Sequence, residues 1–192
     1  MNSGKKYKLS GVRLLGRQSI ENLLPAIFIG LSMGIDFSKI RKTLLSVRPF
    51  PGTMDPLKIK GGPTLIDDTY YANINSVTRA LSYLKLYRGR RIMVLEPLTE
   101  LGKHGKLEHI KLGEQVGRVC DILYLTNKNY YSEIVAGIKK SKGKCVVTIE
   151  PTSKIINFIK DECNNDDVVL FEGGEAAIPL SFIKKSAKIK PH

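Results

Sequence analysis

The sequence predicts an α/β fold in which a mostly parallel sheet is flanked by helices. From about residue 53 onwards, short apolar runs alternate with longer stretches of helical periodicity. This alternation is typical of strand–helix–strand units with right-handed crossovers. Residues 92–95 and 168–171 are apolar at every position, as expected of strands that are covered on both faces. With 42% hydrophobic residues, the 192-residue chain has enough apolar side chains for a core.

The first 48 residues do not read as a domain of their own. Residues 7–15 are expected to form a strand, and residues 19–33 a helix with an apolar face. Asp36 is placed to cap a second helix. A strand and two amphipathic helices need something to pack on, so residues 49–52 are interpreted as a hinge into the next domain. The apolar face of the first helix is expected to consist of Leu23, Leu24, Ile27, Phe28 and Leu31.

The part after the hinge is expected to be a Rossmann-like layered domain. Its strands are predicted at residues 56–59, 63–66, 90–95, 121–125, 144–149 and 167–171. Its helices are predicted at residues 76–87, 106–119, 130–140, 152–163 and 179–186.

The chain is strongly basic. It contains 31 Lys and Arg residues and 18 Asp and Glu residues, which gives a net charge of +13. Such a charge can attract nucleic acid or an anionic nucleotide. The lysines are spread along the chain without interleaved aromatic residues, which favours a generally lysine-rich surface over a nucleic-acid site. The longest apolar run, residues 23–33, is shorter than the roughly 20 residues of a bilayer span. No membrane segment or leader is expected, and the cytoplasm is the expected location.

Cysteines and histidines do not indicate a metal site. The three cysteines form no Cys-x-x-Cys pair, so neither a zinc site nor a disulfide framework is expected. His104 and His109 miss the i, i+4 spacing of a helical zinc site. Both histidines are expected to be exposed to solvent or to cap a helix.

Residues 65–76 carry the strongest signal for a ligand. A buried strand is expected to lead into Asp67 and Asp68, followed by a polar loop and a helix that begins at Asn75 or Ser76. A carboxylate at the carboxyl end of a strand, facing a helix N-terminus, is where open α/β sheets bind ligands. The carboxylate can accept hydrogen bonds from sugar hydroxyls, and the helix start favours a phosphate. The alternative is that Asp68 only caps the turn.

Four ordered motifs resemble those of the Mur ligase family. Residues 67–76, Asp-Asp-Thr-Tyr-Tyr-Ala-Asn-Ile-Asn-Ser, are similar to the family's Asp-Asp-Ser-Tyr-Asn-Ala-Asn-Pro-x-Ser. Residues 16–22 resemble its Gly-x-His-Asn-x-x-Asn, and residues 51–55 resemble its Pro-Gly-Arg-Met-Glu. Residues 100–102 with His109 resemble its Glu-Leu-Gly…His. The similarity is nearest to the ligases that add D-alanyl-D-alanine.

The resemblance implies a division into two parts. Residues 1–48 would be the end of the central, ATP-hydrolysing domain, and residues 49–192 the carboxy-terminal domain. Mur ligases join an amino acid or dipeptide to a UDP-linked muramic acid precursor of peptidoglycan, using ATP and Mg²⁺. The phosphate-binding loop Gly-x-x-x-x-Gly-Lys-Ser/Thr does not occur in this sequence. The chain alone is therefore expected to be inactive. ATP, Mg²⁺ and the UDP-sugar-peptide would be bound through other domains, in a longer chain or in a P-loop partner.

The resemblance also implies roles for five residues, none of them catalytic. Asp68 matches the aspartate that holds the ATP ribose, and Asn22 and Asn73 match asparagines of the nucleotide pocket. Glu100 and His109 are candidates for contacts on the substrate side. For Asn22, the alternative of a helix-start residue that binds its own backbone stays open. No metal ligand is assigned.

Several positions in and beyond these motifs differ from the family pattern. His, Arg, Asn, Asp and Lys of the family are replaced here by Gln18, Thr53, Tyr71, Pro97 and Glu172. Exchanging arginine for threonine and lysine for glutamate reverses the electrostatics of a site for anions. A second hypothesis is therefore a stand-alone, non-catalytic binding protein that kept the fold and changed the pocket.

Overall fold

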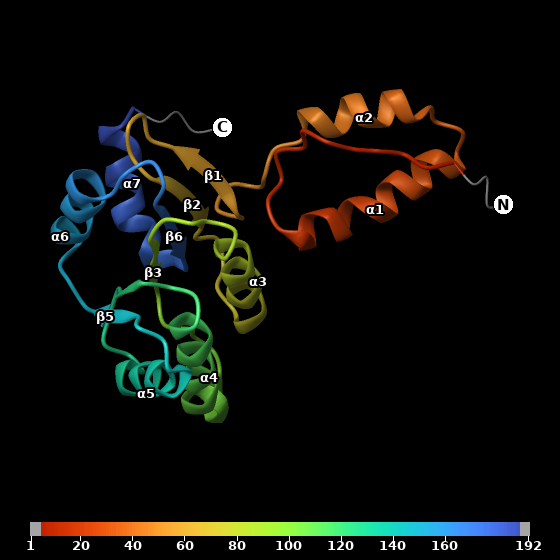
Figure 1. Ribbon diagram of the computed structural model, residues 1–192. Helices are drawn as coiled ribbons and strands as arrows, with labels where there is room; N and C mark the ends of the chain where they lie inside the picture. Colours follow the sequence, from red (N-terminus) through yellow and green to blue (C-terminus); the bar gives the residue numbers. More distant parts are fainter. Residues whose placement is uncertain (1–4, 189–192) are drawn as a thin grey trace.

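The computed structural model describes residues 5–188, and its main body is a six-stranded sheet (Figure 1). The strand order is β1-β2-β6-β3-β4-β5. The edge strand β1 is antiparallel to β2, and the other neighbouring strands are parallel. The strands are β1 Asp55–Lys58, β2 Thr64–Asp68, β3 Arg91–Leu95, β4 Ile122–Leu125, β5 Val146–Thr148 and β6 Val168–Glu172. The predicted α/β fold with a mostly parallel sheet is confirmed.

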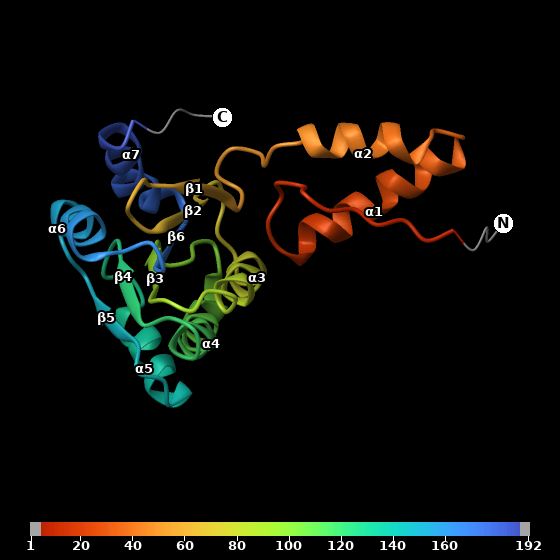
Figure 2. The ribbon, with the colours of Figure 1, turned by 45° about the horizontal axis from the view of Figure 1, so that its top comes forward.

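Helices cover both faces of this sheet, as Figures 1 and 2 show. One face is covered by α3 (Ile74–Leu84), α4 (Gly105–Gly117) and α5 (Tyr131–Ser141), and the other by α6 (Thr152–Asn157) and α7 (Ala177–Ser186). Each layer has its own core: Ile66, Met93 and Leu123 pack towards α3, α4 and α5. Leu65, Ile92 and Phe171 pack towards α6 and α7. Successive residues of a strand point to opposite faces, which is why these runs are apolar throughout.

Three short turns complete the domain, with a 3₁₀ turn at Gly102–His104, a π turn at Phe158–Glu162 and a second 3₁₀ turn at Gly174–Ala176. The π turn extends α6, so the single helix predicted over residues 152–163 is divided into an α-helical and a π-helical part.

The helices α4 and α5 pack backbone against backbone. A Cβ atom on Gly113 would lie 2.2 Å from the carbonyl oxygen of Ile134, and one on Gly137 would lie 2.1 Å from that of Ile110. No real side chain tolerates such distances. Glycine at these two positions therefore sets how closely the two helices approach.

The first part of the chain forms a helical pair beside the sheet domain (Figure 1). Its helices are α1 (Arg17–Ser32) and α2 (Phe37–Ser46). The backbone N–H of Ser38 donates a 2.7 Å hydrogen bond to the side chain of Asp36, so the predicted cap is confirmed. The predicted strand over residues 7–15 is wrong, because this segment is extended but pairs with no strand in the described part of the chain. A strand needs a neighbour for its backbone hydrogen bonds, and the sheet lies elsewhere.

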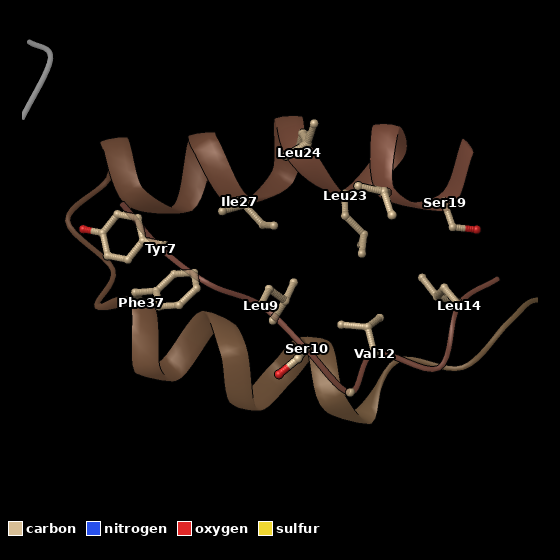
Figure 3. Close-up of a pocket in the computed structure, with 12 residues that line it drawn as sticks. Tyr7, Leu9, Ser10, Val12, Leu14, Ser19, Leu23, Leu24, Ile27 and Phe37 are labelled. Atoms are coloured by element: carbon tan, nitrogen blue, oxygen red, sulfur yellow. The ribbon is translucent and has the colours of Figure 1, made fainter. Parts of the chain in front are cut away.

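The apolar face of α1 is only partly covered. Figure 3 shows Leu23 and Ile27 pointing towards Leu9 of the extended segment, in an open groove of about 470 Å³. Leu24 and Phe28 remain 57% and 72% exposed. The described residues therefore supply a packing partner for only part of the predicted apolar face.

The hinge is anchored on the loop after β2. Gly52 has a φ of 74°, which favours glycine. Its carbonyl oxygen accepts a 2.9 Å hydrogen bond from the N–H of Tyr70, and an added Cβ would lie 3.0 Å from that nitrogen. The hinge is thereby positioned against the carboxyl end of β2, where the predicted ligand residues are found.

Candidate functional site

Two acidic residues meet at the carboxyl edge of the sheet. Asp68 ends β2 and Glu172 ends β6, and the two are partners in the register of these neighbouring strands. Asp67 points to the opposite face, where it pairs with Lys184 of α7 at 2.5 Å. The alternation of side chains along β2 therefore leaves Asp68 alone to face α3 and Glu172.

Asp68 is held in place by the segment that follows the hinge. It is 8% exposed, and its Oδ1 accepts a 3.0 Å hydrogen bond from the backbone N–H of Met54. Met54 has a φ of 47°, in the left-handed region that is uncommon for residues other than glycine. Burial raises the pKa of Asp68, and the hydrogen bond from Met54 acts in the opposite direction. Met54, just after the hinge, thus directs one backbone donor at the carboxylate.

Glu172 is fully buried beside it. Its Oε1 accepts a 3.1 Å hydrogen bond from Oγ of Ser76 in the first turn of α3. Within residues 5–188 its Oε2 has no hydrogen-bond partner. Burial raises the pKa of Glu172 well above its usual range, and the neighbouring Asp68 carboxylate raises it further. Of the two carboxyl groups, Glu172 is therefore the one that binds a proton more readily.

A cavity of about 340 Å³ lies between this edge, the hinge and the start of α1. It brings Asn22 of α1 and Asp68 of β2 to one site, although the two belong to different parts of the chain. Arg79 of α3 contributes the one positive side chain among the residues that line this cavity. The other polar lining residues are Gln18, Ser19, Thr53 and Ser76, and the apolar ones are Leu14, Leu15, Pro49, Phe50, Met54 and Tyr71.

Exposed aromatic side chains line the cavity or lie beside it. Phe50 and Tyr70 make an edge-to-face pair with ring centroids 5.1 Å apart, and they are 61% and 68% exposed. Tyr71 lines the cavity itself and is 57% exposed. Exposed aromatic faces beside a carboxylate and an amide can stack on a flat ring while the polar groups bind hydroxyls. The arrangement fits a ligand of nucleoside shape.

Asn73 was expected to contact a nucleotide, but its side chain is the N-terminal cap of α3. Its side chain caps α3 by accepting hydrogen bonds from the N–H groups of Asn75 and Ser76 at 2.9 and 3.0 Å. In return, the N–H of Asn73 donates to Oγ of Ser76 at 2.9 Å. The helix therefore begins at Ile74, slightly earlier than predicted. Asn73 is not among the residues that line the cavity.

The two candidates for substrate contacts lie apart from the cavity. His109 is fully buried, with Nδ1 2.6 Å from the carbonyl oxygen of Gly105 and its ring stacked on Tyr130 at 3.9 Å. The expectation of solvent exposure is therefore wrong for His109, although His104 is exposed. Burial lowers the pKa of His109, so its ring is neutral at pH 7. Glu100 is exposed and also lies outside the residues that line the cavity.

The described residues contain no group of three or more His, Cys, Asp or Glu side chains that could hold a metal ion. Cys120, Cys145 and Cys163 are buried and free, and burial raises the pKa of each thiol. Between residues 5 and 188, no helix has the length and apolar character needed to cross a membrane.

Sequence reasoning missed the partnership of Asp68 with Glu172 and the position of Arg79. Both carboxylates end apolar runs, which is a usable signal. The hydrophobic periodicity of the sequence does not predict, however, that β6 lies between β2 and β3 in the sheet. Arg79 was visible only as one of many basic residues.

Comparisons with known proteins show which sequences and structures this chain is similar to. Residues 54–174 match the family model described as Mur ligase, glutamate ligase domain. The UDP-N-acetylmuramoyl-tripeptide–D-alanyl-D-alanine ligase of Escherichia coli K12 is 33% identical over 101 residues, which cover 53% of this chain and 22% of that protein. The ligase of the same name from Haemophilus influenzae is 28% identical over 126 residues, which cover 64% and 28%. The chain thus spans only about a quarter of the length of these relatives.

The fold is shared with solved ligases. The structure of the MurF ligase from Thermotoga maritima in complex with ADP aligns with a TM-score of 0.72 at 24% identity. This alignment covers 91% of the present chain and 39% of the Thermotoga maritima chain.

Proposed function

Because this chain belongs to the Mur ligase family, we propose that it is the carboxy-terminal portion of an ATP-dependent ligase. Such a ligase forms an amide bond between the carboxylate of a UDP-muramoyl peptide and an amino acid or dipeptide, for peptidoglycan synthesis in the cytoplasm. The family match over residues 54–174 supports the ligase assignment. The two D-alanyl-D-alanine ligases at 33% and 28% identity favour that dipeptide as the group added.

The observation that carries the proposal is the cavity that joins Asn22 to Asp68. We assign the ribose to Asp68, because a carboxylate fixed by a backbone donor is a strong acceptor for sugar hydroxyls. Phe50 and Tyr71 would contact the base, and Arg79 would face the phosphates. The ADP named for the Thermotoga maritima ligase is consistent with a nucleotide here.

Residues 5–188 do not supply the whole reaction. No group of three or more metal-binding side chains is present in this range, so the residues do not fit a Mg²⁺ site and no step is assigned to the ion. The sequence has no phosphate-binding loop. We therefore propose that this portion positions the nucleotide while a P-loop domain, in a longer chain or a partner, holds the triphosphate.

The test of this proposal is ATP binding by the protein as the cell makes it, measured by calorimetry. Asp68→Asn should weaken ATP binding by about 5- to 150-fold, which corresponds to about 1–3 kcal/mol for a lost hydrogen bond to a charged group. With 2′,3′-dideoxy-ATP the same substitution should have little effect, because the hydroxyls that Asp68 would bind are missing. The exposed Asp166, on the loop before β6, provides a matched Asp166→Asn control that should bind both nucleotides normally. Equal losses for both nucleotides in Asp68→Asn would refute the ribose assignment.

A non-catalytic binding protein is the second candidate. It is favoured by Thr53 and Glu172, which replace an arginine and a lysine of the family pattern and leave Arg79 as the single cation lining the cavity. The intact mass of the protein isolated from its own cell separates the two candidates. A mass near 21.4 kDa together with no P-loop partner would support the binding protein, and a much larger mass would support the ligase.

A further inference from the structure

We propose that Glu172 is a positioning residue for this cavity: it keeps a proton and donates a hydrogen bond through it to the carboxylate of Asp68, so that the buried pair presents a single negative charge to the nucleotide. The inference deepens the proposed function and rests on the nucleotide site. It assigns a role to a residue that stands where the family pattern has a lysine.

The sheet brings the carboxyl groups of Asp68 and Glu172 next to each other. Asp68 and Glu172 end neighbouring parallel strands in register and lie on the face that α3 covers. One oxygen of each carboxyl group already accepts a hydrogen bond. Met54 N–H donates to Oδ1 of Asp68, and Ser76 Oγ donates to Oε1 of Glu172. Within residues 5–188, Oε2 of Glu172 is one of two buried side-chain nitrogen or oxygen atoms that have no hydrogen-bond partner. A proton on Oε2 would turn this unpaired acceptor into a hydrogen-bond donor. The carboxylate of Asp68, which is the register partner of Glu172 on the adjacent strand, is the neighbouring acceptor.

The surrounding charges do not offer another way to neutralise the pair. Arg79 is on the exposed side of α3 and acts on both carboxylates only from a distance. Lys184 is on the opposite face of the sheet and is committed to Asp67. Glu96, which follows β3, accepts a 3.0 Å hydrogen bond from the N–H of Glu175 and adds negative charge. Two ionised carboxylates in this place would therefore lack a buried counter-ion among the described residues, and a shared proton is the remaining solution.

The shared proton has a consequence for ligand binding. When pH rises and the pair loses this proton, a second negative charge appears at the cavity, and the affinity for an anionic nucleotide falls. One proton coupled to binding changes the affinity by at most about tenfold per pH unit. At the same time the hydrogen bond that orients Asp68 is lost.

The first experiment measures ATP affinity by calorimetry between about pH 7.5 and 9.5, where the phosphates of ATP are already ionised. Glu172→Gln keeps a neutral donor in the same shape, so this variant should bind ATP with the same affinity across the range. Wild type should lose affinity by up to about tenfold per pH unit above the pKa of the pair. The control Glu175→Gln removes an exposed carboxylate at the same edge of the sheet and should follow the wild type.

The second experiment needs no nucleotide and follows the melting temperature against pH. Because the pKa of Glu172 is raised in the folded state, the stabilising effect of its proton is complete below the unfolded pKa of about 4.3 and is lost as pH rises through the folded pKa. Wild type should lose stability over that window relative to Glu172→Gln.

The outcomes separate the two levels of the proposal. If ATP binds with the same pH dependence in wild type and Glu172→Gln, the role of Glu172 is refuted while the nucleotide site stands. If ATP binds at no pH although Glu172→Gln flattens the stability profile, the proton pair is real but it does not serve a nucleotide site, and the proposed function fails with it. If Mg²⁺ alone raises the melting temperature of wild type but not of Glu172→Gln, a metal ion occupies the pair and the inference is overturned.

Discussion

Replacing Gly137 by alanine tests how the structure joins α4 to α5. The added Cβ would lie 2.1 Å from the carbonyl oxygen of Ile110 and 2.9 Å from Cα of Gly113. Both are backbone atoms, so no flexible side chain can swing aside. The two helices would have to move apart, and the core residues beneath them, such as Leu112 and Ile134, would lose contacts.

The size of the effect follows from two opposing contributions. Overpacking in a well-packed core costs about 1–3 kcal/mol, and a clash with two backbone atoms belongs at the upper end. Alanine is favoured over glycine within a helix by about 1 kcal/mol. The free energy of unfolding should therefore fall by about 2 kcal/mol, which for a chain of this size lowers the melting temperature by about 4–8 °C.

Urea denaturation followed by circular dichroism measures this change. Ser132→Ala, at an exposed position of the same helix, is the matched control and should stay within about 0.5 kcal/mol of wild type. The midpoint for Gly137→Ala should fall while the slope with urea stays the same. A variant at least as stable as wild type would refute the close approach of the two helices.

Three further predictions concern other features of the domain. Asp167 is 2% exposed and accepts hydrogen bonds from the backbone N–H groups of Arg90 and Asn164, both at 2.9 Å. Burial alone would raise the pKa of Asp167, but these hydrogen bonds and the Arg90 guanidinium outweigh burial, so the pKa is lowered. Its stabilising effect is therefore present above pH about 3.9 and lost as pH falls through the lowered folded pKa, so urea midpoints of Asp167→Asn should show less loss in acid than wild type. Asn73→Ala should cost about 1 kcal/mol of unfolding free energy through the lost cap, and an ATP affinity that changes by much more than the stability would instead indicate a contact with the nucleotide. Leu112→Ala, at a fully buried site, should cost about 2–5 kcal/mol in the same denaturation assay, and a smaller loss would show that the layer under α4 is loosely packed.

The sequence predicted the sheet domain well because its signals are local. Apolar runs mark the parallel strands of the sheet, and the turn residue Asp36 marks a helix start by its own hydrogen bond. The strand predicted over residues 7–15 failed for the opposite reason. An extended, apolar segment becomes a strand only when a neighbouring strand accepts its hydrogen bonds, and that neighbour is not encoded in the segment itself.

The candidate site was predictable only in part. The position of Asp68 followed from a carboxylate after a buried run, and its pairing in space with Asn22 followed from the family resemblance rather than from periodicity. Glu172 could be recognised as a departure from the family pattern, but the strand order needed to place it beside Asp68 is a property of the assembled sheet. Asn73 shows the remaining ambiguity, since the same amide can cap a helix or contact a ligand.

The sheet has two open edges, and both are poor templates for another strand. On one side, β1 contains Pro56, which has no N–H to donate, and the exposed charge of Lys58. On the other side, β5 consists of only Val146–Thr148. An incoming strand would find few donors on β1 and little length on β5, so edge-to-edge polymerisation of folded molecules is disfavoured. A protein that leaves apolar helix surface uncovered beside its sheet is thus protected against amyloid-like association at the sheet itself.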